Sequence, residues 1–185
     1  MEIKKIKDYF LSGSSCLCVA GMVATIISVL WQILKASFGL GFVKVYAIEI
    51  ILLIAGPFLL LITIKRTIKT HSLLSKLKRD SSINEVYFAL NDTTGNICFN
   101  ENEVIISYKY LIIKDAVAII PYQQLTKVYI KYINNDKKEI TAVQLYCDTD
   151  KKKKILIFPN IRLKQTLILF VEKLKEKNPN IIFEL

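Results

Sequence analysis

Few residues of this chain have the type and spacing that catalysis requires. The single histidine, His71, lies in a basic segment, and we interpret it as a solvated helix residue rather than a general base. Asp148 and Asp150 are a carboxylate pair of the kind used in acid–base or metal chemistry, but four lysines follow, which favours an ordinary polar turn. The sequence contains no GxSxG, P-loop, HExxH or GxGxxG motif. We therefore expect a protein that is not an enzyme and uses no cofactor.

The four cysteines form no CxxC pair, and none lies near His71, so we expect neither a metal site nor a disulfide framework. Cys16 and Cys18 belong to an apolar run, whereas Cys98 and Cys147 fall in expected strands. We interpret all four as small buried side chains, with palmitoylation of Cys16 or Cys18 as the weaker alternative.

Two long apolar runs dominate the first third of the chain. Residues 9–34 carry no charged side chain, and residues 46–64 carry only Glu49. A helix needs about 20 apolar residues to cross a hydrocarbon core of roughly 30 Å. The sequence therefore predicts an α+β membrane protein whose residues 1–64 form a two-helix transmembrane hairpin, with helices at about 11–34 and 46–64.

The basic residues beside these runs predict the orientation of the hairpin. The connector carries only Lys35 and Lys44. The outer flanks carry Lys4, Lys5, Lys7, Lys65, Arg66, Lys69, Lys76, Lys78 and Arg79. Because basic loops stay inside the cell, we expect a multi-pass protein of the cell membrane with both termini cytoplasmic.

Small and polar residues recur along the first run at spacings of three and four, which places them on one helix face. They are Ser14, Cys18, Gly21, Thr25, Ser28 and Gln32. Such residues let helices approach closely, so we predict a packing seam against the second helix or a second copy, with a substrate path as the alternative.

Residues 65–95 form a basic helical linker. Its bases Lys65, Arg66, Lys69, Lys76, Lys78 and Arg79 are candidates for contact with anionic lipid. The alternative is that these bases act only as a positively charged stop-transfer signal after the second helix. Ser82 is expected to cap a short helix over 83–91, with Glu85 completing a capping box.

Residues 96–185 form a separate domain in which strands over 97–158 are followed by a helix over 160–177. Short apolar stretches alternate with polar turns, as in antiparallel meanders. Strands are expected at 97–99, 103–107, 110–114, 116–120, 127–133, 140–147 and 154–158. Asn160 is the expected helix cap, and residues 181–185 are a candidate for one more strand.

The stretch from Val104 to Ile130 resembles bacterial pleckstrin-homology-like (PH-like) domains, where a strand pair and a third strand precede a proline-led turn and a further strand. Residues 119–128, IIPYQQLTKV, carry that pattern. The resemblance implies an antiparallel β-barrel or sandwich closed by the C-terminal helix, in a family of bacterial membrane proteins with two helices before such a domain. It implies no catalytic residues. The loop FNENE at 99–103 is acidic, unlike the basic loop with which many PH domains bind phosphoinositides.

We expect a membrane-anchored, non-enzymatic scaffold whose PH-like domain binds a protein partner or a second copy. The alternative is a module that responds to anionic lipid. The net charge of +10 suits a contact with such lipid. Its contacts would be the linker bases and a second basic run, Lys151, Lys152, Lys153 and Lys154. An accessory subunit of a transporter or membrane enzyme ranks third. The lipid bilayer and a protein are the expected partners, and nucleic acid is not.

Overall fold

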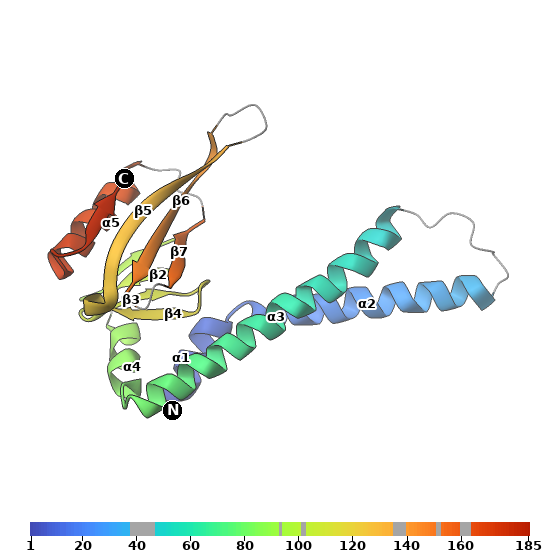
Figure 1. Cartoon of the computed structure of the whole chain (residues 1–185). Helices are drawn as coiled ribbons and strands as arrows, with labels where there is room; N and C mark the ends of the chain where they lie inside the picture. Colours follow the sequence, from blue (N-terminus) through green and yellow to red (C-terminus); the bar gives the residue numbers. More distant parts are fainter. Residues whose placement is uncertain (38–46, 93, 101–102, 135–139, 151–152, 160–163) are drawn as a thin grey trace. The chain divides into compact units, whose positions relative to one another are not determined.

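The chain folds as an α+β protein with helices in its first part and two β-sheets in its second (Figure 1). The computed structural model describes residues 1–37, 47–92, 94–100, 103–134, 140–150, 153–159 and 164–185. Within these ranges the side chains of 14–17, 35–37, 47–53, 134, 140–142 and 164 are left out. The chain divides into two compact units, which we call the helical unit (Lys7–Lys76) and the β-unit (Met1–Ile6 with Leu77–Leu185).

The first three helices are α1 (Glu2–Leu11), α2 (Ser14–Ser37) and α3 (Ala47–Arg79). Gly13 separates α1 from α2 with a φ of +83°, a left-handed conformation that glycine adopts without steric cost. The helix predicted over 11–34 therefore begins only at Ser14. In the helical unit, Nε of Arg66 donates a 2.8 Å hydrogen bond to the carbonyl of Phe10, which the end of α1 leaves unpaired.

Helices α2 and α3 pack against each other through glycines. A Cβ added to Gly21 would lie 3.0 Å from the carbonyl oxygen of Gly56, and one added to Gly56 would collide with the Thr25 hydroxyl. That hydroxyl donates a hydrogen bond of 2.8 Å to the Gly21 carbonyl within α2. The absence of two side chains therefore allows the close approach of the two backbones.

Among the residues whose side chains the structure describes, no helix is both long enough and apolar enough to cross a membrane. This finding contradicts the predicted transmembrane hairpin over 1–64 and the multi-pass location in the cell membrane that followed from it. The apolar part of α3 includes Glu49 and ends at Lys65 and Arg66. The predicted connector, 36–45, lies almost wholly outside the described residues.

In the segment Leu77–Leu185 of the β-unit, α4 (Ile83–Asn91) precedes a four-stranded sheet. The strands β1 (Ile97–Phe99), β2 (Val104–Ile106), β3 (Tyr110–Ile113) and β4 (Ala118–Pro121) pair antiparallel in chain order. All side chains of β2 and β3 are buried, so these strands form the centre of the sheet and hold the turn between them, 107–109, in place.

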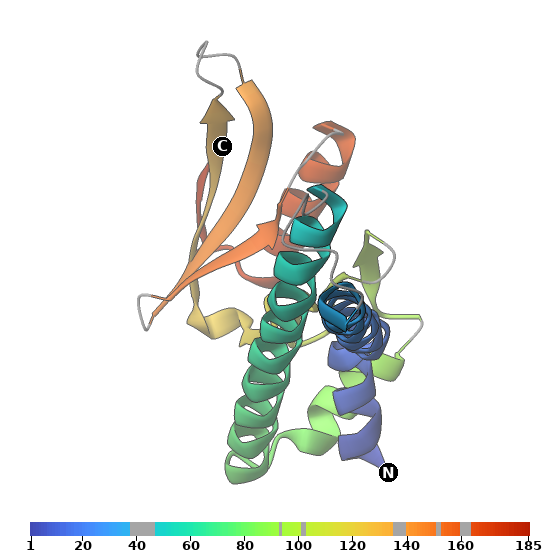
Figure 2. The same cartoon turned by 90° about the vertical axis from the view of Figure 1, so that its right-hand side faces the viewer.

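The second sheet has the order β7-β6-β5-β8, and its long strands β5 and β6 lie side by side in Figure 2. Its members are β5 (Leu125–Asn134), β6 (Ile140–Thr149), β7 (Lys154–Phe158) and β8 (Ile182–Glu184), and a 3₁₀ turn, η1 (Tyr122–Gln124), precedes β5. The first three pair antiparallel, whereas β8 returns after α5 (Lys164–Lys177) and pairs parallel to β5, with Phe183 opposite Val128. The sheet is therefore mixed.

The core of the β-unit draws on both sheets and on α5. The ring of Phe170 in α5 lies edge-on to Phe99 and Phe158, with centroids 5.4 and 5.3 Å away, and Phe170 is completely buried. Such edge-to-face pairs add to the free energy of burial. Helix α5 is therefore an integral part of this unit, and it places its last turn beside η1, where Asn178 Nδ2 donates to the Tyr122 carbonyl at 2.8 Å.

The basic linker predicted over 65–95 is divided between two helices. Residues 65–79 continue α3, and α4 coincides with the short helix expected after Ser82. The expected cap is not formed, because Ser82 makes no side-chain capping hydrogen bond. Glu85, the expected partner in that capping box, instead bonds to residues of the first sheet.

Candidate functional site

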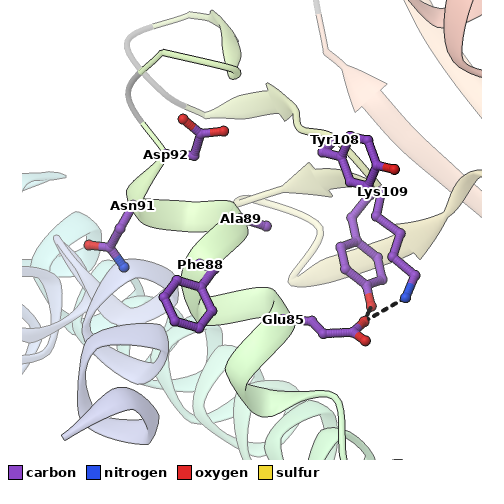
Figure 3. Close-up of a pocket in the computed structure, with 8 residues that line it drawn as sticks. Glu85, Phe88, Ala89, Asn91, Asp92, Tyr108 and Lys109 are labelled. Carbon is purple, nitrogen blue, oxygen red and sulfur yellow. Dashed lines mark hydrogen bonds and ion pairs between the residues drawn. The ribbon is translucent and has the colours of Figure 1, made fainter.

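A groove of about 650 Å³ lies between α4 and the β2–β3 turn, and we call it the α4 groove (Figure 3). Helix α4 contributes residues from one face, spaced three and four apart, and the turn contributes the facing wall. The lining residues are Glu85, Phe88, Ala89, Asn91, Asp92, Tyr108, Lys109 and Tyr110. The volume is in the range of ligand sites, and carbon atoms provide most of the wall.

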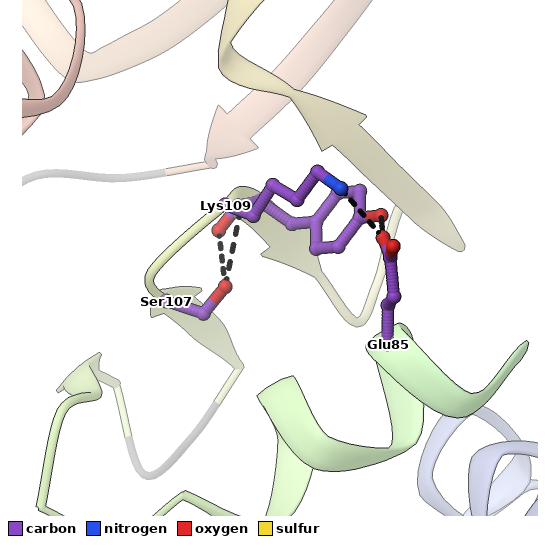
Figure 4. A network of polar contacts seen from close by, with 4 residues as sticks. Glu85, Ser107 and Lys109 are labelled. Atoms are coloured by element: carbon purple, nitrogen blue, oxygen red, sulfur yellow. Dashed lines mark hydrogen bonds and ion pairs between the residues drawn. The ribbon is translucent and has the colours of Figure 1, made fainter. Parts of the chain in front are cut away.

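One carboxylate joins the two walls of the α4 groove. Oε2 of Glu85 accepts hydrogen bonds from Lys109 Nζ at 2.7 Å and from the Tyr110 hydroxyl at 2.6 Å (Figure 4). These donors stabilise the charged carboxylate, so the pKa of Glu85 lies below its ordinary value, with the hydrogen bond from Lys109 the largest cause. Burial and the neighbouring Glu85 charge together raise the pKa of Tyr110, which stays a neutral donor.

A buried hydrogen-bond network fixes the conformation of the β2–β3 turn. The Tyr122 hydroxyl donates to the carbonyls of Ser107 and Tyr110, at 2.8 and 2.9 Å. Oγ of Ser107 accepts a 3.1 Å hydrogen bond from the Tyr110 amide, within the same turn. Burial raises the pKa of Tyr122, so its hydroxyl remains a donor over the physiological range. Such satisfied buried networks fix a local conformation.

Two large aromatic side chains of the α4 groove remain open to solvent. Phe88 in α4 is 68% exposed, and Tyr108 at the tip of the turn is 82% exposed. At the far end, Asp92 accepts three hydrogen bonds from Thr94 and Gly95, which lower its pKa and close the turn after α4. The turn that carries Tyr108 is fixed by the hydrogen bonds of Tyr122, whereas the ring itself is open to solvent.

A second groove, of about 930 Å³, begins on the other side of Tyr108 and Lys109, and we call it the α5 groove. It runs past η1 and the end of α5 and is more polar, with exposed side chains at Gln123, Asn180 and Ile182. Lys177 Nζ lies 5.9 Å from the centre of the Tyr108 ring. Tyr108 and Lys109 therefore line both grooves at one edge of the β-unit.

The grooves offer apolar walls, exposed rings and amide groups, which suit the binding of a ligand more than the catalysis of a reaction. Glu85 is already paired with two donors, and Asp92 with three hydrogen bonds. Asp148 and Asp150 are not among the lining residues of either groove, and Asp148 in β6 accepts a 3.4 Å hydrogen bond from the Tyr129 hydroxyl. His71 is exposed on α3.

The residues proposed for lipid contact occupy different settings. Arg66 binds the Phe10 carbonyl, and Arg79 lies 3.6 Å from the Asp80 carboxylate. Lys154 Nζ lies over the rings of Tyr129 and Tyr146, at 5.0 and 4.6 Å, so it belongs to a cation–π cluster on the second sheet. The bases that point to solvent are Lys65, Lys69, Lys76, Lys78 and Lys153. Lys151 and Lys152 lie outside the described residues.

The predicted helix-packing residues lie along the less exposed side of α2. Gly21 and Ser28 are buried, and Cys18, Thr25 and Gln32 are half-buried. Their neighbours Val19, Met22 and Ile26 are about half exposed or more, at 60%, 49% and 56%. The side chain of Ser14 is not described. Gly21 lies next to Gly56 of α3.

Sequence reasoning missed the residues that form the two grooves. The sequence places Glu85 in an expected capping box and Phe88 in an expected short helix. Tyr108 falls between the expected strands 103–107 and 110–114, and it lies in the turn between β2 and β3. A signal was present in the segment SYKY, 107–110, where an aromatic and a basic residue interrupt two apolar strands.

Comparisons of the chain with protein-family models, curated proteins and solved structures found no match, so the interpretation of the site depends on its own geometry.

Proposed function

We propose that this chain is a non-enzymatic protein-interaction module, in which a PH-like β-unit binds an extended segment of a protein partner along the α4 groove and the α5 groove. The observation that carries this proposal is the exposure of Phe88 and Tyr108 on the two walls of one groove. Exposed aromatic side chains held by rigid elements are typical of the residues that dominate the binding energy of protein interfaces.

The shape of the surface favours a polypeptide as the ligand. The two grooves share Tyr108 and Lys109, so they form one path from α4 to the end of α5. The apolar α4 groove suits an aromatic or aliphatic anchor side chain. The exposed amides of Gln123 and Asn180 in the α5 groove can pair with the backbone groups of an extended segment.

The order of the elements supports the PH-like part of the proposal. Seven strands in two sheets, β1–β4 and β5–β7, precede a helix whose apolar side completes the core. A scaffold of this kind presents its turns and helix ends on a rigid base, which is where binding residues usually lie.

The proposal is tested by selecting peptides from a random display library against the full chain. Selected peptides should carry an aromatic or large aliphatic anchor, and Phe88→Ser or Tyr108→Ser should weaken their binding at least tenfold, since buried aromatic anchors contribute about 2 kcal/mol or more. Tyr132→Ser is the matched control, because Tyr132 is 54% exposed on β5, outside both grooves.

Two outcomes would contradict the proposal. The first is a library that yields no enriched peptide, and the second is a set of selected peptides that bind the groove variants as well as they bind the original chain.

A further inference from the structure

One face of α3 is apolar in its first part and basic in its second part. Residues 54, 58, 61, 65, 69, 72 and 76 are spaced three and four apart and therefore lie along one side of the helix. The first three, Ile54, Phe58 and Leu61, are 63%, 62% and 64% exposed. They are followed on the same side by Lys65, Lys69 and Lys76, which are also exposed. We call this row the outer face of α3.

The outer face lies away from the packed side of the helix. Gly56, Thr63, Thr70 and Leu74 occupy the opposite side and are buried, and Gly56 contacts α2. Helix α3 continues without interruption from the apolar part of the row to its basic part (Figure 1). The row is thus a continuous exposed surface with carbon at one end and positive charge at the other.

Charge decides which ligand suits this surface. The described side chains of α2 and α3 in the helical unit, 18–34 and 54–76, include no carboxylate. A second copy of these helices would offer the lysines no negatively charged side chain. An anionic lipid surface instead offers both hydrocarbon and phosphate, which match the apolar and the basic part of the row.

We infer that the outer face of α3 binds an anionic phospholipid surface, with Phe58 and Leu61 entering among the acyl chains and Lys65, Lys69 and Lys76 meeting the phosphates. The contact needs one face of one helix lying at the lipid surface and involves no crossing. It is a second binding surface, independent of the α4 groove and of the peptide ligand proposed for it.

The test is flotation of the full chain with vesicles of phosphatidylcholine alone or with 30% phosphatidylglycerol, at low and at physiological salt. Binding should require phosphatidylglycerol and weaken with salt, because exposed charges are screened beyond roughly 8 Å at physiological ionic strength. Replacing Lys65, Lys69 and Lys76 with Gln should lower the affinity roughly fivefold for each charge removed, as expected near an anionic surface.

Matched variants distinguish an effect of the outer face of α3 from an effect of net charge. Replacing Lys131, Lys173 and Lys175 with Gln removes the same charge from the β-unit and should leave vesicle binding within twofold. Phe58→Ser with Leu61→Ser should weaken binding at every salt concentration, whereas these exposed positions should not affect folding. Far-UV circular dichroism checks that all variants retain their helices.

Three results would overturn the inference. The first is equal binding to both vesicle types. The second is an equal loss in the two triple-lysine variants. The third is a chain that ignores vesicles and forms a dimer that Phe58→Ser with Leu61→Ser dissociates, which would assign the face to a second copy.

Discussion

The carboxylate of Glu85 in α4 accepts a 2.6 Å hydrogen bond from the hydroxyl of Tyr110 in β3, 25 residues further along the chain. Lys109 completes the arrangement with an ion pair of 2.7 Å to the same oxygen. One carboxylate thus ties a short helix to the β2–β3 end of the first sheet and sets the spacing of the two walls of the α4 groove.

The first prediction concerns the pH dependence of this tie. The pKa of Glu85 is lowered in the folded chain, so its contribution to stability is present above its unfolded value, about 4.5, and is lost as the pH falls through the folded pKa. Glu85→Gln should therefore reduce the hydrogen-exchange protection of the α4 amides at pH 6, and the difference from the original chain should shrink as the pH falls below about 4.5. Glu172→Gln, an exposed carboxylate on α5, is the control. A difference that persists unchanged at pH 3 would contradict the assignment.

The second prediction concerns the core. Phe170 is fully buried between Phe99 and Phe158, so Phe170→Ala should destabilise the β-unit by about 3–5 kcal/mol. Ile168→Ala, on the exposed side of the same helix, should change stability by less than about 0.5 kcal/mol. Native-state hydrogen exchange of the β2 and β3 amides measures both. Similar small effects would mean that α5 is not packed as described.

The third prediction concerns the thiols of the β-unit. Burial raises the pKa of Cys147 to about 12, whereas Cys98 is exposed on β1. Because the thiolate is the reactive form, Cys98 should react with a disulfide reagent at pH 8 at least roughly a thousandfold faster than Cys147. Mass spectrometry of the modified peptides measures the two rates. Comparable rates in the folded chain would show that Cys147 is accessible.

The fourth prediction tests the packing of α2 on α3. A Cβ on Gly21 would lie 3.3 Å from Cβ of Leu59, close to the separation found in disulfides. In a chain with its native cysteines replaced, Gly21→Cys with Leu59→Cys should therefore form a disulfide under mild oxidation. Val23→Cys with Leu59→Cys should not, because Val23 is 47% exposed on another side of α2. Cross-linking of both pairs with equal yield would refute the glycine contact.

Local pattern predicted much of the β-unit. The alternation KVYIKYI, 127–133, lies within β5, and the helix expected over 160–177 includes α5. Alternation defines strands because side chains on successive residues point to opposite faces. The short strand β8 was expected only as a candidate, and its parallel pairing with β5 depends on a contact between residues far apart in sequence.

The helical part was less predictable from composition. Two apolar runs indicated a transmembrane hairpin, and the described helices contradict it. The break at Gly13 was also missed, because Lys4, Lys5 and Lys7 were interpreted only as flanking charges although they belong to α1. The small-residue spacing, in contrast, identified the side of α2 that holds Gly21.

The candidate site could not be predicted because its walls come from separate elements. Glu85 satisfies the pattern of a capping box, yet Lys109 and Tyr110 compete for its carboxylate and bind it. Phe88 and Tyr108 look like core residues in the sequence, and only the packed structure shows both rings exposed.

Hydrogen–deuterium exchange of the full chain with and without a selected peptide locates the residues that the peptide covers. If the two grooves bind the peptide, exchange slows in α4, in the 107–110 turn and at 178–182, with little change in α2 and α3. Protection confined to the helical unit or to the β5–β6 hairpin, with α4 and the turn unchanged, would contradict the proposal that these grooves bind the partner.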